Sequence, residues 1–220
     1  MQTIDLVRVA VALVAGFFLG GIPFGIIVPR LIGGPDPRNI GSGRTGGANV
    51  SRAVGYRWAA VSGLLDVAKA SVAVLLIIAI GGNDVARVAA ALAAIVGHSR
   101  SPFIGFHGGR GVAPATGGAL IIAPLILAVI FPVFVIVIAV TRTSSLGSLG
   151  ASLAGGVIMV VATAVVPLPP IYYVYGVGGA GLIWLFHLDN IQRLVSGKER
   201  RLGRSDPPGS AGDRAADAPR

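Results

Sequence analysis

Two short breaks between apolar runs combine glycine, hydroxyl and arginine residues in a pattern that suits phosphate binding. Residues 41–52 read GSGRTGGANVSR, and residues 108–111 read GGRG. Successive glycines let neighbouring backbone N–H groups turn towards one point and form an anion nest. In the first break, Ser42 adds a hydroxyl, Arg52 adds a planar guanidinium, and a helix beginning near Gly47 would add its positive end. The alternative for the first break is a flexible glycine loop whose arginines contact lipid headgroups. For the second break it is a turn that starts a helix and whose arginine extends to the membrane interface.

Two pairs of polar residues accompany these breaks. His187 and Asn190 end the last apolar run and, three positions apart, would share one helical face. Asp66 and Lys69 have the same spacing inside an earlier run, where ionisable residues are functional candidates. The structural alternative for the second pair is a charge pair that fixes helix packing. His98 alone is more often a structural hydrogen-bonding residue than a ligand or a base.

The composition excludes an ordinary soluble domain. The 220 residues are 54% hydrophobic and 12% charged, and the mean hydropathy is +0.80, which favours several membrane spans. A net charge of +9 suggests nucleic-acid binding, but the arginines stand at the ends of apolar runs, so we expect no nucleic-acid partner. The chain has no cysteine, which excludes thiolate metal ligands, and its three histidines give only poor support for a metal site. We therefore expect neither a metal nor another cofactor.

The apolar runs predict a bundle of helices. They lie near residues 6–28, 58–80, 86–97, 111–123, 125–140, 146–166 and 171–187. The first run is interpreted as a retained span, because Asp5 precedes Arg8 and no small-x-small cleavage site follows. The stretch 111–140 is divided at Pro124, because this division places all the arginine clusters on one side of the membrane.

The charge pattern therefore predicts an all-α polytopic membrane protein. It has seven transmembrane helices, with the N-terminus outside and the C-terminus in the cytoplasm. Residues 1–196 form the membrane domain. Residues 197–220 are rich in Gly, Pro, Asp and Arg and are predicted to form a disordered cytoplasmic tail that carries no chemistry.

Taken together, the motifs resemble those of the membrane-integral glycerol-3-phosphate acyltransferases that use acyl-phosphate, the PlsY type. That family shares GSGNxGATN followed by arginine, then GH with aromatics and GGKGVA, and finally HxxN at the last span. The matching positions, in chain order over residues 20–198, are Gly41, Ser42, Gly43, Gly46, Asn49 and Arg52, then Gly97, His98, Phe103, Phe106, Gly108, Gly109, Gly111, Val112 and Ala113, then His187 and Asn190. The chain differs in having Arg44 for Asn, Arg110 for Lys and Asp189 for the common Glu.

The resemblance implies transfer of a fatty acyl group from acyl-phosphate to the 1-hydroxyl of glycerol 3-phosphate, at the cytoplasmic face of a bacterial inner membrane. The products are lysophosphatidic acid and phosphate. The implied catalytic residues are Ser42, Arg52, Arg110, His187 and Asn190. The implied substrate-binding residues are Gly41, Gly43, Gly46, Asn49, His98, Gly108, Gly109 and Gly111. Glycerol 3-phosphate, acyl-phosphate and membrane lipid are the implied partners, without a cofactor.

Within this hypothesis, Arg110 and its glycine loop hold the acyl-phosphate head, and Ser42, Arg52, His187 and Asn190 hold glycerol 3-phosphate. The proton of the attacking hydroxyl goes either to the donor's phosphate or to His187. Two other functions stay open. A small transporter of a phosphate ester would need ionisable groups along a midplane path, often with an internal repeat. An inactive relative acting as a scaffold would explain the substitutions at Arg44 and Arg110.

Overall fold

The computed structural model describes residues 3–202, and all the regular secondary structure within that range is helical. The α-helices are α1 (Thr3–Gly21), α2 (Phe24–Leu31), α3 (Gly47–Ala79), α4 (Asp84–Ser99), α5 (Val112–Ile122), α6 (Leu127–Thr141), α7 (Ser144–Val165), α8 (Ile171–Phe186) and α9 (Leu188–Val195). Short 3₁₀ turns lie at Pro37–Asn39, Pro102–Ile104 and Pro124–Ile126. The predicted all-α class is confirmed.

Several of these helices have the length and apolarity of membrane spans. Four stretches of the described chain qualify, and the bent pair α8–α9 makes a fifth. The four are Thr3–Leu31, Gly47–Ala79, Pro124–Thr141 and Ser144–Val165. Large apolar side chains such as Val140 and Val165 face outwards, as lipid-facing positions do. The protein is therefore built as a multi-pass membrane protein.

Proline and glycine account for the differences between the predicted and observed helices. The first predicted run is broken after Gly21, and α2 begins at Phe24, because Pro23 has no N–H to continue α1. α3 is kinked at Gly55, whose φ of 84° is not helical, so a short helical segment that begins at Gly47 precedes the span predicted from residue 58. The expected break at Pro124 is present, between α5 and α6.

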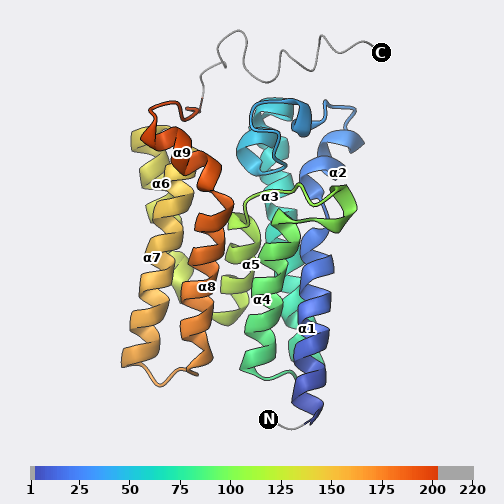
Figure 1. The fold of residues 1–220 in the computed structure, drawn as a ribbon, viewed down its shortest axis with the longest axis vertical. Coiled ribbons are helices and arrows are strands. Elements are labelled where there is room, and N and C mark those ends of the chain that lie inside the picture. Colours follow the sequence, from blue (N-terminus) through green and yellow to red (C-terminus); the bar gives the residue numbers. More distant parts are fainter. Residues whose placement is uncertain (1–2, 203–220) are drawn as a thin grey trace.

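The helices form two groups. α1 packs along α4 with α3 beside them, α7 packs between α6 and α8, and α5 contacts α3 and α4 between the two groups (Figure 1). The segment that joins α2 to α3, the loop before α5, and α9 all lie at the end of the molecule opposite the start of α1 (Figure 1). All three sequence motifs are therefore gathered at one end of the helix bundle.

Candidate active site

A cavity of about 970 Å³ opens between the two helix groups at this end. Its wall contains all five residues that the sequence predicted to be catalytic, namely Ser42, Arg52, Arg110, His187 and Asn190. Of the predicted substrate-binding residues, Gly46, Asn49 and His98 also line the cavity. The structure thus brings the three motifs together around one space, although they are far apart in the chain.

The part of the cavity that borders α6, α7 and α8 is largely apolar. Its lining includes Ile130 and Phe134 on α6, Met159 on α7, and Gly176 and Gly179 on α8. An apolar recess that begins at a cluster of cations has the shape and polarity expected for a long hydrocarbon chain that carries an anionic head.

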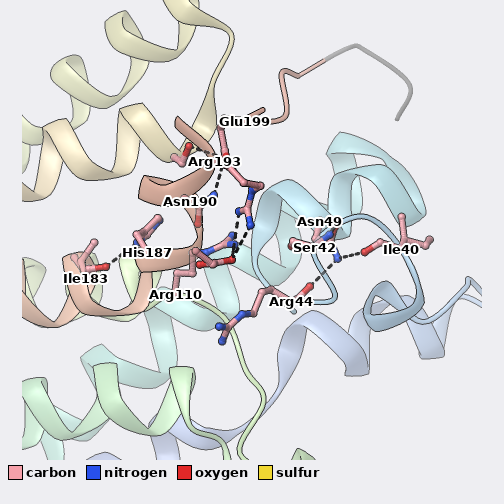
Figure 2. Close-up of polar contacts among 12 residues, drawn as sticks. Ile40, Ser42, Arg44, Asn49, Arg110, Ile183, His187, Asn190, Arg193 and Glu199 are labelled. Atoms are coloured by element: carbon pink, nitrogen blue, oxygen red, sulfur yellow. Dashed lines mark hydrogen bonds and ion pairs between the residues drawn. The ribbon is translucent and has the colours of Figure 1, made fainter. Parts of the chain in front are cut away.

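Asn49 organises the first loop. The carbonyl oxygens of Pro37, Ile40 and Arg44 lie 2.6, 2.8 and 2.9 Å from its Nδ2, and the backbone N–H of Ser42 donates to its Oδ1 at 3.3 Å (Figure 2). Because both ends of this buried amide are engaged by the loop, Asn49 positions Ser42 and Arg44. Asn49 also lines the cavity, so the substrate contact that was predicted for it stays a prediction.

The first turn of α3 supplies the positive end that the sequence predicted. Gly46 is extended, α3 begins at Gly47, and both line the cavity with Ala48. The N–H groups of a first helical turn have no partner within the helix and attract anions. Arg52 lies one turn further on, and its Nη1 donates to the Ala48 carbonyl at 3.2 Å. A helix N-terminus and a guanidinium therefore face the same end of the cavity.

The second glycine loop does not form the expected anion nest at its first two residues. The backbone N–H of Gly108 donates to the Ser99 carbonyl and that of Gly109 to the His98 carbonyl, both at 3.1 Å. A Cβ added to Gly108 would collide with the His98 carbonyl oxygen, and one added to Gly109 would collide with the His98 imidazole. These glycines are needed because the loop lies directly against the end of α4. This contact places Arg110 at the cavity.

The remaining predicted glycines also act through the backbone. Gly41 and Gly43 have φ values of 54° and 67° in the first loop, and Gly111, with a φ of 84°, caps α5. In all three cases the residue occupies the left-handed region, which side chains disfavour. None of the three is among the residues that line the cavity, and all lie in the loops that carry its lining residues.

Arg110 is held by a carboxylate from α9. Its Nη2 donates to Asp189 Oδ2 at 2.8 Å, and Arg193 approaches the same oxygen at 3.2 Å (Figure 2). One oxygen of the Asp189 carboxylate therefore pairs with two guanidinium groups. Burial lowers the pKa of Arg110, which Asp189 opposes. Among the described residues, Arg110 Nε and Asp189 Oδ1 are buried without a hydrogen-bond partner, which suits a site that awaits a polar ligand.

His187 and Asn190 do not share one continuous helix, contrary to the sequence interpretation. The chain bends by 63° between α8 and α9, and His187 is the residue at the bend. Both side chains still line the cavity. His187 Nδ1 lies 2.8 Å from the Ile183 carbonyl oxygen, which only accepts, so Nδ1 carries the proton and Nε2 is left as an acceptor (Figure 2).

The predicted pair inside α3 is confirmed and joins three parts of the fold. Lys69 Nζ lies 2.6 Å from Asp66 Oδ1, 2.6 Å from the Ile22 carbonyl oxygen and 3.1 Å from His98 Nδ1. These contacts link α3 to α4 and to the break between α1 and α2, which favours the structural alternative. They also occupy one ring nitrogen of His98, a predicted substrate contact that here supports both this cluster and the Gly109 loop.

The sequence reasoning missed three residues that line the cavity, Ser145, Arg193 and Glu199. Glu199 Oε1 accepts from Ser145 Oγ at 2.8 Å and from Asn190 Nδ2 at 2.6 Å, and its Oε2 accepts from Arg193 Nε at 2.9 Å. Residues 197–202 therefore belong to the folded site, and the predicted boundary at residue 197 is wrong for them; residues 203–220 lie outside the described part. The one feature of the sequence that could have drawn attention to Glu199 is that it is the only glutamate in the chain.

Comparison with known proteins identifies the family. A sequence model described as glycerol-3-phosphate acyltransferase matches residues 10–197. The glycerol-3-phosphate acyltransferase of Thermus thermophilus is 38% identical over 191 residues, covering 87% of this chain and 94% of the relative. That of Allorhizobium ampelinum is 35% identical over 212 residues, covering 93% and 99%.

Solved structures give the same result. The crystal structure of PlsY (YgiH), an integral membrane glycerol 3-phosphate acyltransferase, in its glycerol 3-phosphate form has a TM-score of 0.80 and 31% identity, with 89% of this chain and 96% of that chain covered. Its lysophosphatidic acid form has a TM-score of 0.78 and 30% identity, with 89% and 95% covered. The chain belongs to the glycerol-3-phosphate acyltransferase family.

Proposed function

We propose that this protein transfers a fatty acyl group from acyl-phosphate to the 1-hydroxyl of sn-glycerol 3-phosphate. The products are lysophosphatidic acid and inorganic phosphate, and the reaction is the first step of bacterial phospholipid synthesis. The observation that carries this function is the single cavity in which Arg52 and Arg110 face the same space as an apolar recess. Two anions and one hydrocarbon chain are the ligands that such a cavity accommodates together.

Each substrate group has a matching part of the cavity. Arg52, Ser42 and the first turn of α3 are donors, so they hold the phosphate of glycerol 3-phosphate. His187 Nε2 and Asn190 Oδ1 are acceptors, so they receive the hydroxyl groups of the same substrate. Arg110 holds the head of acyl-phosphate, and the acyl chain extends into the recess beside α6, α7 and α8.

The chemistry requires positioning more than a covalent enzyme intermediate. The 1-hydroxyl oxygen bonds to the acyl carbon, the bond from that carbon to the phosphate oxygen breaks, and phosphate leaves. Bringing the two anions together and stabilising charge on the leaving group are the contributions of Arg110, Arg52 and the helix end. The hydroxyl proton goes to the donor's own phosphate, and His187 Nε2 serves as a hydrogen-bond acceptor for the substrate.

The proposed topology has seven crossings, with the N-terminus outside, the C-terminus inside and the cavity facing the cytoplasm of the bacterial inner membrane. The grouping of the arginine-rich segments at one end of the bundle supports it. So does the 2.7 Å hydrogen bond from the Leu202 N–H to the Arg142 carbonyl, which joins the α6–α7 turn to the C-terminal segment. Because the chain has no cysteine, Asn39→Cys and Pro170→Cys give single labels at opposite ends. An impermeant thiol reagent applied outside intact cells is expected to label only the second.

The activity is tested with purified protein, palmitoyl-phosphate and radiolabelled glycerol 3-phosphate. We expect lysophosphatidic acid to form, and palmitoyl-CoA to be ineffective in place of palmitoyl-phosphate. Arg52→Ala and Arg110→Ala are expected to reduce kcat/KM by at least about 100-fold, as loss of a charge-assisted contact to a reacting anion does. Binding of glycerol 3-phosphate without acyl transfer by folded wild-type protein would contradict the proposed reaction.

A further inference from the structure

The only glutamate of the chain is built into the wall of the cavity. Its two carboxylate oxygens accept three hydrogen bonds, from Ser145 on α7 and from Asn190 and Arg193 on α9. Arg193 is itself held by Asp189 at 3.2 Å. Glu199 therefore joins two helices and has both oxygens engaged by the protein, so it is not placed to contact an anionic substrate.

This arrangement determines the orientation of the Asn190 amide. An ionised carboxylate has acceptors and no donor, so only the NH₂ end of the amide forms a hydrogen bond with Glu199 at 2.6 Å. The reversed amide would bring its oxygen against a carboxylate oxygen at the same distance. Asn190 is therefore left with Oδ1 as the polar atom for a ligand. That atom is buried and has no hydrogen-bond partner within residues 3–202.

We propose that Glu199 is a positioning residue that holds the Asn190 amide with its oxygen available to a hydroxyl of glycerol 3-phosphate. Asn190 then acts only as an acceptor, and the glycerol end of the substrate is selected by this acceptor together with His187 Nε2. Inorganic phosphate lacks the glycerol hydroxyl groups that reach this end of the site, so it gains nothing from these two acceptors. The proposal rests on the proposed function, because it takes glycerol 3-phosphate as the ligand.

The first variant is Glu199→Gln, which removes the charge and permits the Asn190 amide to reverse. We expect the KM for glycerol 3-phosphate to rise about tenfold, as loss of one oriented hydrogen bond predicts, while the KM for palmitoyl-phosphate changes less than about twofold. Lys198→Gln removes the adjacent charge as a matched control and is expected to leave both KM values unchanged. Affinity for glycerol 3-phosphate, measured by calorimetry, is expected to follow the KM.

A double variant, Asn190→Asp with Glu199→Gln, tests whether Glu199 acts by orienting the side chain at position 190 or only by stabilising the fold. Asn190→Asp alone places two carboxylates side by side, so it is expected to weaken glycerol 3-phosphate binding. Combined with Glu199→Gln, the glutamine NH₂ donates to one oxygen of the aspartate and the other oxygen serves as the acceptor. The double variant keeps the net charge of the wild type. We expect its KM for glycerol 3-phosphate to return to within about threefold of the wild-type value.

Different failures have different meanings. If folded Glu199→Gln binds glycerol 3-phosphate as tightly as the wild type, or if the double variant is no better than either single variant, the positioning role is wrong. Loss of folded protein in both Glu199→Gln and the double variant would make Glu199 a structural residue and also overturn the proposal. If the wild type produces no lysophosphatidic acid while calorimetry shows the expected pattern of affinities, the proposed function fails and the positioning role stands.

Discussion

Arg110 Nη2 lies 2.8 Å from Asp189 Oδ2, although the two residues are 79 positions apart in the chain. This ion pair connects the loop before α5 to α9, and it leaves Arg110 Nε buried without a partner among the residues described. A planar guanidinium offers several donors in fixed directions, so one is held by Asp189 while another is available to a ligand. The ion pair therefore fixes the direction in which the Arg110 side chain extends into the cavity.

The first prediction concerns this pair. Asp189→Asn removes the charge that anchors Arg110 and Arg193, so Arg110 loses its fixed direction. We expect the KM for palmitoyl-phosphate to rise about tenfold, in line with loss of a partly buried charged hydrogen bond. Asp189→Glu keeps the carboxylate and serves as the matched control, with a smaller rise. Equal values for Asp189→Asn and the wild type in steady-state assays would show that Asp189 does not position Arg110.

A second prediction distinguishes packing from phosphate binding at the glycine loop. In Gly109→Ala the new methyl group would meet the His98 imidazole, so the loop must move away from α4. We expect the Tm of the protein in detergent to fall by several degrees, with loss of activity because Arg110 moves with the loop. Gly181→Ala, where an added Cβ has nothing within 4 Å, is the control and should not lower the Tm. A rise in KM with an unchanged Tm would instead favour an anion nest.

The sequence predicts the features of this site that depend on local backbone chemistry, but not those that depend on contacts between segments far apart in the chain. The break at Pro124 and the helix start at Gly47 follow from local backbone chemistry, and the structure has both. The roles of Gly108 and Gly109 could not be predicted in this way, because their N–H groups donate to carbonyl oxygens at the end of α4. Glu199 stands in a polar segment typical of a disordered tail, and its contacts with α7 and α9 exist only in the folded chain.

The third prediction addresses the buried charges of α3. Asp66 and Lys69 are almost fully buried and 2.6 Å apart, so removal of either one leaves an uncompensated charge. Asp66→Asn and Lys69→Met are each expected to destabilise the protein by about 3–5 kcal/mol. The double variant is expected to cost less than the sum, because no isolated charge remains. Chemical unfolding in detergent measures the three values, and strict additivity would contradict a direct interaction.

The last prediction concerns the role of His187 as a hydrogen-bond acceptor. Its Nδ1 lies 2.8 Å from the Ile183 carbonyl oxygen, so Nδ1 donates to the protein and Nε2 is left for a substrate hydroxyl. His187→Gln keeps an acceptor but cannot act as a base. We therefore expect kcat at saturating substrate to stay within about threefold of the wild-type value, while the KM for glycerol 3-phosphate rises about tenfold. Loss of a general base would instead lower kcat by about 100-fold or more. A small change in kcat with a raised KM would place His187 in the site as an acceptor and leave the donor's phosphate to take the proton.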